Sequence, residues 1–167
     1  MKKHTGILLS GLLLLAACAS RLGGSNNPGT TWAPGAFNST GEQIYFTAVD
    51  GRGNRIPYTG GPDIRGMMMG GYLTCASCHG PNARGGVHVM HMQTMDAPDI
   101  RWPALITMDA KDRGLPPGQG SYDLATFRQA VVEGKDPAGD GLSNDMPRWR
   151  MDDQDLAELA AYLQSLR

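Results

Sequence analysis

The sequence is poor in aromatic residues, in net charge and in long apolar runs. Phe, Trp and Tyr make up 7% of the 167 residues, which predicts a thin core unless something other than side chains helps to fill it. The formal net charge is −1 and the basic residues are not clustered, so charge does not favour a nucleic-acid partner. The one apolar run near the start, Ile7 to Leu15, has about nine residues, too few to span a membrane.

Cysteine is scarce too, and two of the three cysteines lie in one short motif. Cys75 and Cys78 are separated by two residues and followed at once by His79, which is the attachment signature of c-type haem. In that chemistry each thiol adds to a haem vinyl group as a thioether, and the imidazole that follows binds the iron. If both thiols become thioethers, no cysteine pair remains for a disulfide.

Two other chemistries use the same cysteine spacing. A redox pair would want a thioredoxin-like βαβ context, and a zinc site would want a second Cys or His pair at ligand spacing. The sequence contains neither pattern. We therefore predict one covalently attached haem c, which would also fill the thin core.

The first residues resemble an export signal. Lys2 and Lys3 precede the apolar run, and small residues follow it, so residues 1–17 are predicted to be a secretory leader. The sequence from Leu15 to Cys18 resembles a bacterial lipobox, which would make Cys18 a lipidated mature N-terminus. Cleavage after Ala19 is the alternative and would release a soluble protein. We expect a lipid-anchored protein on the periplasmic side of a bacterial membrane. Ala19 follows the lipidated cysteine and is not Asp, which by analogy with bacterial lipoproteins favours the outer over the inner membrane.

Composition divides the rest of the chain into a tether and one domain. Residues 18–37 are rich in Gly, Ser, Asn and Pro and poor in apolar side chains, so we expect a flexible tether behind the lipidated residue. Residues 38–167 are predicted to form a single domain.

The domain is predicted to be all-α with long loops. Thr40 to Gln43 has the form of a capping box that opens a helix. The turn residues from Asp50 to Asn54 also allow a short β-hairpin insertion over residues 44–59. A short helix is expected at 104–108, another from Leu124 to a stop at Gly134, and a last one capped by Asp152.

Met146 is the best candidate for the second axial ligand of the iron. It lies in a loop between two predicted helices, outside any apolar periodicity, and Pro147 restricts the backbone after it. A thioether favours ferrous iron, so His/Met ligation raises the reduction potential and suits electron transfer. The alternative is a methionine that plugs the core.

In their order along the chain, these motifs resemble a class I bacterial cytochrome c with a single haem. The resemblance covers about residues 40–167 and rests on Cys75-x-x-Cys78-His79-Gly80, Gly85-Gly86, Pro98-Asp99-Ile100, Phe127 with Gly134, Met146-Pro147-x-Trp149, and Asp155 to Leu163. It implies a small cytochrome c fold around one haem.

The resemblance also implies particular contacts. The first and last helices should cross, with Gly41 and Tyr45 against Leu159 and Tyr162, and the carbonyl of Pro98 should accept the proton-bearing nitrogen of His79. Three side chains are plausible partners of the haem propionates, the alternative being ordinary surface or packing roles: Arg101, Arg148 and Trp149.

Two insertions depart from the compact family pattern, at about residues 50–69 and 79–98. The second holds side chains that suit copper: His88, Met90, His91, Met92 and Met95. Met67 to Met69 in the first insertion are also candidates. Copper binding or copper delivery is therefore an alternative function, and exposed histidines beside a soft docking surface are the simpler interpretation. Met90, His91 and Met92 are also rivals of Met146 as iron ligands.

Together these observations predict an electron carrier and not an enzyme. Iron with two axial side chains has no free position for a substrate, and a tether would raise the effective concentration near redox partner proteins. Two alternatives remain besides copper. One is an open iron that binds a small ligand, and the other is an electron-entry subunit of a larger oxidase or reductase.

Overall fold

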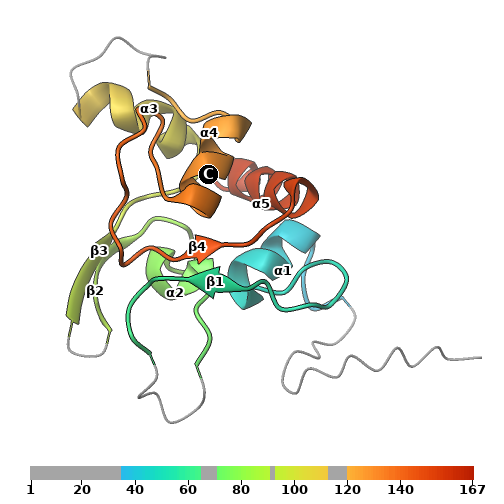
Figure 1. Ribbon diagram of the computed structural model, residues 1–167. Helices are drawn as coiled ribbons and strands as arrows, with labels where there is room; N and C mark the ends of the chain where they lie inside the picture. Colours follow the sequence, from blue (N-terminus) through green and yellow to red (C-terminus); the bar gives the residue numbers. More distant parts are fainter. Residues whose placement is uncertain (1–34, 65–70, 91–92, 113–119) are drawn as a thin grey trace, which may run out of the picture.

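A computed structural model describes residues 35–64, 71–90, 93–112 and 120–167 (Figure 1). The helices are α1 (Thr40–Thr47), α2 (Cys75–His79), α3 (Trp102–Asp112), α4 (Leu124–Arg128) and α5 (Asp153–Ser165), and a π-helical turn, η1 (Gln129–Glu133), continues α4. The strands are β1 (Tyr58–Thr59), β2 (Gly86–Met90), β3 (Gln93–Ala97) and β4 (Arg148–Trp149). The predicted leader, Cys18, most of the tether, Met67 to Met69, His91 and Met92 lie outside the described residues.

Helices α1 and α5 cross, as expected, and Gly41 lies at the crossing. A Cβ atom on Gly41 would meet the Glu158 backbone oxygen at 2.0 Å and the Tyr162 Cβ at 2.9 Å, so only glycine allows this approach. The rings of Tyr45 and Tyr162 lie beside the crossing with centroids 5.3 Å apart. The predicted first and last helices therefore meet where the sequence indicated.

The start of α1 differs by one residue from the prediction. Ser39, in an extended conformation, is the N-cap and accepts the Glu42 amide proton, whereas Thr40 is already helical. The Glu42 carboxylate in turn accepts the Asn38 amide proton. A Ser-Thr pair offers two possible caps, and the reach of Glu42 back to Asn38 favours the earlier one.

The caps predicted for the two later helices are present. Asp123 accepts the Thr126 amide proton at the start of α4, and Asp152 accepts the Asp155 amide proton at the start of α5. Gly134 ends η1 in the left-handed conformation, with φ of 71°. Helix α3 is longer than the predicted helix at 104–108, since it begins at Trp102.

The strands correct the expectation of an all-α domain. Strand β1 pairs antiparallel with β4, and β2 pairs antiparallel with β3. The second pair lies in the insertion after the haem motif. Within residues 44–59, where a hairpin was expected, the structure has an isolated bridge between Val49 and Arg55, and strand β1 pairs with the distant β4. The domain is thus mostly helical with a few short strands.

A network of charged groups joins the turn after α1 to the start of α5. The Asp50 carboxylate accepts the backbone protons of Arg52 and Asn54. The Arg52 guanidinium then reaches Asp152 at 2.9 Å and Asp155 at 3.2 Å. This network holds the two crossing helices in register from the side.

The core lies between α1, α4, η1 and α5. Its largest fully buried side chains are Tyr45, Ile44, Leu156, Leu163 and Val49. Among the described residues, no helix combines the length and the apolar character that crossing a membrane requires.

Candidate functional site

The predicted haem motif forms the short helix α2. Thr74 caps it through a reciprocal pair of bonds with Ser77. The Tyr45 hydroxyl, which projects from α1, donates to the Gly80 carbonyl at 2.6 Å just after the helix. The motif is therefore tied to the α1–α5 crossing, and burial raises the pKa of Tyr45 so that the hydroxyl keeps its proton.

His79 is buried, with 7% of its surface exposed, and its Nδ1 lies 3.0 Å from the Pro98 carbonyl oxygen. This is the contact that the resemblance implies. Burial lowers the pKa of His79, which favours a neutral ring, and the Pro98 contact then assigns the proton to Nδ1. The Nε2 lone pair is left available as a metal ligand.

Gly85 explains how Pro98 reaches His79. A Cβ atom on Gly85, whose φ is 64°, would meet the Ala97 backbone oxygen at 2.0 Å and the Pro98 oxygen at 2.4 Å. The Gly85 amide also donates to the His79 carbonyl at 2.9 Å. The chain after His79 thus packs directly on the backbone of Ala97 and Pro98, which brings the Pro98 carbonyl to the ring.

Both thiols of the motif have a raised pKa. Burial raises the pKa of Cys75 to about 12. Burial and the nearby Asp145 carboxylate also raise the pKa of Cys78. Reactive cysteines have lowered pKa values, so the environment disfavours the redox interpretation of the pair.

Beside α2 lies a cavity of about 280 Å³. Both thiols, His79 and Met146 line it, so four of the predicted haem-binding side chains meet in one space. Its walls are otherwise mainly apolar and come from loops and from α3, α4, η1 and α5; they include Leu73, Ile100, Leu105, Phe127, Val131, Leu159 and Leu163. This donor set and these walls fit a haem attached through two thioethers.

The Met146 loop is held by its backbone. Arg148 donates to the carbonyl oxygens of Met146 and Leu142. On the other side, the Gly61 amide donates to the Asn144 carbonyl at 3.0 Å, and a Cβ on Gly61 would meet Pro147 Cγ at 2.9 Å. The loop is therefore positioned by contacts that leave the Met146 thioether at the cavity.

Of the described methionines, Met95 is the other one that lines the cavity. It is buried on β3, which runs directly into Pro98. Met90 is half-buried against the core but is not part of the cavity wall. Met90 is the one predicted rival within the described residues, and it does not line the cavity; Met95, which the sequence offered only as a possible copper ligand, is therefore the methionine to test against Met146.

The three predicted propionate partners have different positions. Trp149 is 3% exposed and lines the cavity. Arg101 instead forms an ion pair with Asp99 at 2.5 Å, and Arg148 binds backbone carbonyls. Three acidic residues of the cavity lining were not foreseen: Asp96, Asp136 and Asp145. Nothing in their sequence context distinguishes them from ordinary surface residues.

The insertion rich in His and Met forms the β2–β3 pair. His88 lies opposite Met95 across the two strands, and Met90 lies two residues further along β2. The His88 Nδ1 is 3.2 Å from the Gly86 carbonyl, and its Nε2 is buried without a hydrogen-bond partner. Within the described residues, no group of three or more His, Cys, Asp or Glu side chains suits a metal ion.

Comparison with known protein families places most of the chain within one family model. A family model described as Cytochrome c matches residues 39–167, a span that includes every residue of the cavity wall. No curated protein and no solved structure matches the chain.

Proposed function

Because the chain belongs to the cytochrome c family, whose members bind covalently attached haem c, we propose that it is a class I monohaem electron carrier. Cys75 and Cys78 would hold the haem, and His79 and Met146 would be the axial ligands of the iron. The observation that carries the proposal is the single cavity that these four side chains line. When bound, the haem supplies a one-electron iron couple.

The protein's own residues would orient and enclose that group. Through its bond to Nδ1, the Pro98 carbonyl sets the His79 ring and raises the basicity of Nε2. Arg148 and Gly61 hold the loop of Met146. If His79 and Met146 both bound the iron, no position would be left for a substrate, which favours a carrier over an enzyme.

Met95 is a weaker candidate than Met146 for the second ligand. Strand β3 leads directly to Pro98, which contacts the His79 ring, so Met95 approaches from the segment that supports the first ligand. The Met146 loop belongs to a separate part of the chain, between η1 and β4. This arrangement supports His79 and Met146, which come from separate parts of the chain, as the two residues that would bind the iron.

We also propose that the carrier is exported and tethered to a membrane. The lipobox-like sequence ending at Cys18 supports lipid anchoring, and the family match begins only at residue 39. A tether of about fifteen to twenty residues would let the domain swing between two partners while raising their effective concentration.

Copper binding is a second candidate function. The observation that favours it is the buried, unpartnered Nε2 of His88, which lies on the strand pair that also carries Met90 and Met95. Imidazole and thioether ligands suit Cu(I). Titration of the haem-loaded protein with Cu(I) should give one equivalent bound and none in His88→Ala; the same stoichiometry in both would exclude His88 as a ligand.

A redox titration of the full protein, followed optically, tests the carrier function. We expect a reversible one-electron transition, and we expect that carbon monoxide leaves the spectrum of the reduced protein unchanged. A carbon monoxide complex formed by the native protein would show an open iron and would overturn the proposal.

A further inference from the structure

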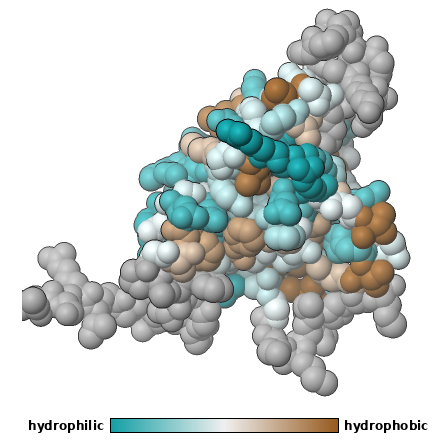
Figure 2. Space-filling view, turned by 180° about the vertical axis from the view of Figure 1, so that it is seen from behind, coloured by the Kyte–Doolittle hydropathy of each residue, from teal (hydrophilic) through white to brown (hydrophobic). Residues whose placement is uncertain are grey.

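The outer face of the β2–β3 pair exposes apolar side chains to solvent. Val87 is 71% exposed and Val89 is 70% exposed, the highest values among the large exposed hydrophobic residues of the described chain. Their cross-strand partners are Asp96 and Thr94, both exposed. Figure 2 shows hydrophobic atoms at the end of the molecule that carries this pair, at the right of that view. Met95, which points the other way, is buried.

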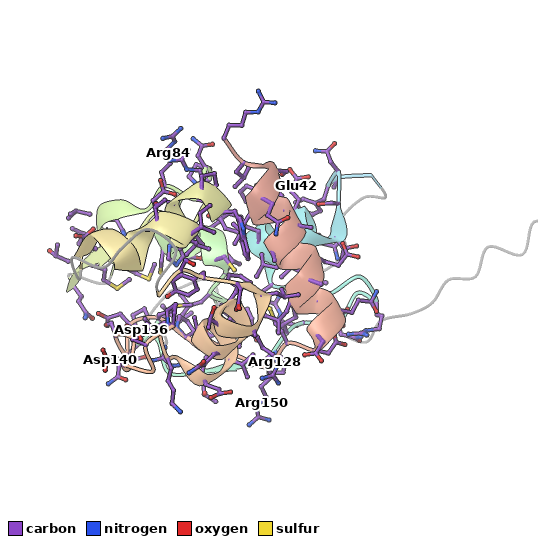
Figure 3. All side chains as sticks on the ribbon, turned by 90° about the horizontal axis from the view of Figure 1, so that it is seen from above. Glu42, Arg84, Arg128, Asp136, Asp140 and Arg150 are labelled. Carbon is purple, nitrogen blue, oxygen red and sulfur yellow. The ribbon has the colours of Figure 1, made fainter. Side chains whose placement is uncertain are left out.

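An acidic loop lies beside this face. In Figure 1 the segment between η1 and β4 passes next to β2 and β3, and Gln93 of β3 donates to the Asp145 carboxylate at 3.2 Å. Figure 3 places Asp136 and Asp140 of this loop at the same end of the molecule. In that view Arg128 and Arg150 lie along the lower edge of the molecule, further from this end. The Asp145 carboxylate therefore lies beside the strand pair, and Asp96 lies opposite Val87 on the face that carries the valines.

The same face lies close to the haem-attachment site. Met95, Asp96 and Ala97 of β3 line the cavity that contains both thiols. Asp145 lines the same cavity as Cys78. A protein bound to this face would therefore be separated from the cavity by little more than the strand pair and the Asp145 loop.

We propose that this face, made of Val87, Val89, Asp96 and the acidic loop 136–145, is the docking surface for a redox protein. The proposal rests on the carrier function. The partner's contact face would be apolar at its centre and rich in Lys and Arg around it. Charge complementarity selects that partner, because a second copy of this chain or an anionic lipid surface would be repelled by the same carboxylates.

The test uses a cation that imitates this chemistry. Tris(phenanthroline)cobalt(III) carries three positive charges and apolar ring faces, and ferricyanide is the anionic comparison. In stopped-flow experiments one electron passes from the reduced protein to cobalt(III), which becomes cobalt(II), and no proton moves. The rate constant is measured at about 10 mM and about 1 M ionic strength, where the Debye lengths are about 30 Å and 3 Å.

Charge and apolar variants separate the two parts of the surface. Asp96→Asn and Asp140→Asn should each slow the cobalt reaction about threefold at low ionic strength, speed the ferricyanide reaction, and lose both effects at high ionic strength. Val87→Ser combined with Val89→Ser should slow the cobalt reaction about threefold at both ionic strengths and leave ferricyanide unaffected. Glu158→Gln and Leu124→Ser are the matched controls, since Glu158 is partly exposed on α5, Leu124 is exposed on α4, and neither belongs to the strand pair or the acidic loop.

Rates in the surface variants equal to those of the controls would overturn the docking surface. The reduction potential of each variant is measured alongside, so that a change in driving force is not mistaken for docking. If the variants keep the one-electron transition of the native protein and react as fast as the controls, this surface alone is rejected. An open iron in the native protein would instead reject the carrier function itself.

Discussion

Replacing Gly41 by alanine should separate the two helices that close the cavity. The new Cβ would lie 2.0 Å from the Glu158 backbone oxygen, where ordinary contact begins at 3.4 Å, so the helices must move apart by about 1.4 Å. The Tyr162 Cβ at 2.9 Å blocks escape to one side. We expect the steric overlap to lower the free energy of unfolding by about 3 kcal/mol and the higher helix propensity of alanine to raise it by about 1 kcal/mol, a net loss of about 2 kcal/mol.

Urea unfolding of the haem-loaded protein measures this loss. With a slope of about 2 kcal/mol per molar urea, the midpoint should fall by about 1 M. Gly141→Ala is the matched control, because nothing lies within 4 Å of its Cβ position and its backbone is not left-handed; its midpoint should shift by less than about 0.3 M. If Gly41→Ala behaves like this control, the helices do not cross at Gly41.

Three further changes test the network around the site. Tyr45→Phe removes the hydrogen bond to the Gly80 carbonyl and should lower the free energy of unfolding by about 1–2 kcal/mol. The loss should be equal at pH 7 and pH 9, because burial raises the pKa of Tyr45 and the hydroxyl stays protonated at both; a smaller loss at pH 9 would contradict this. Arg148→Gln frees the carbonyls of Leu142 and Met146, so the near-infrared band of the sulfur-to-iron bond should vanish at a lower urea concentration than global unfolding. In the control Arg150→Gln, the band and the fold should be lost together. Burial alone would raise the pKa of Asp50, but hydrogen bonds from Asn54 and Arg52 outweigh it and hold the pKa below its ordinary value of 3.8. The Asp50 carboxylate therefore stabilises the fold fully above pH 3.8 and less as the pH falls through the lower pKa of the folded state. Asp50→Asn should lower the free energy of unfolding by about 1–2 kcal/mol at pH 7, and the difference from the native protein should shrink in acid. A difference that grows in acid would refute the assignment.

Local chemistry made part of the site predictable. The cysteine and histidine spacing is itself the attachment chemistry, so the positions of Cys75, Cys78 and His79 in one cavity could be expected. The aspartates that cap α4 and α5 act within three residues of their own position, and the sequence therefore indicates them directly. Both kinds of signal depend only on neighbouring residues.

Long-range contacts were harder to foresee. The β2–β3 pair was missed because its short alternation of Val with His and Met was interpreted as a metal-binding composition. Arg148 was offered as a plausible propionate partner because arginine makes paired bonds to carboxylates, with a surface role as the alternative; its hydrogen bonds to three backbone carbonyls depend on the fold and could not be foreseen. The same limit applies to Gly85, whose role depends on a backbone segment twelve residues further along.

The most direct test of the account is the near-infrared spectrum of the oxidised protein, which reports a thioether bound to haem iron. We predict a sulfur-to-iron band in the native protein and in Met95→Ala, and its loss in Met146→Ala. A band that survives Met146→Ala and vanishes in Met95→Ala would contradict the assignment of Met146, and the absence of a band in the native protein would contradict His/Met ligation altogether.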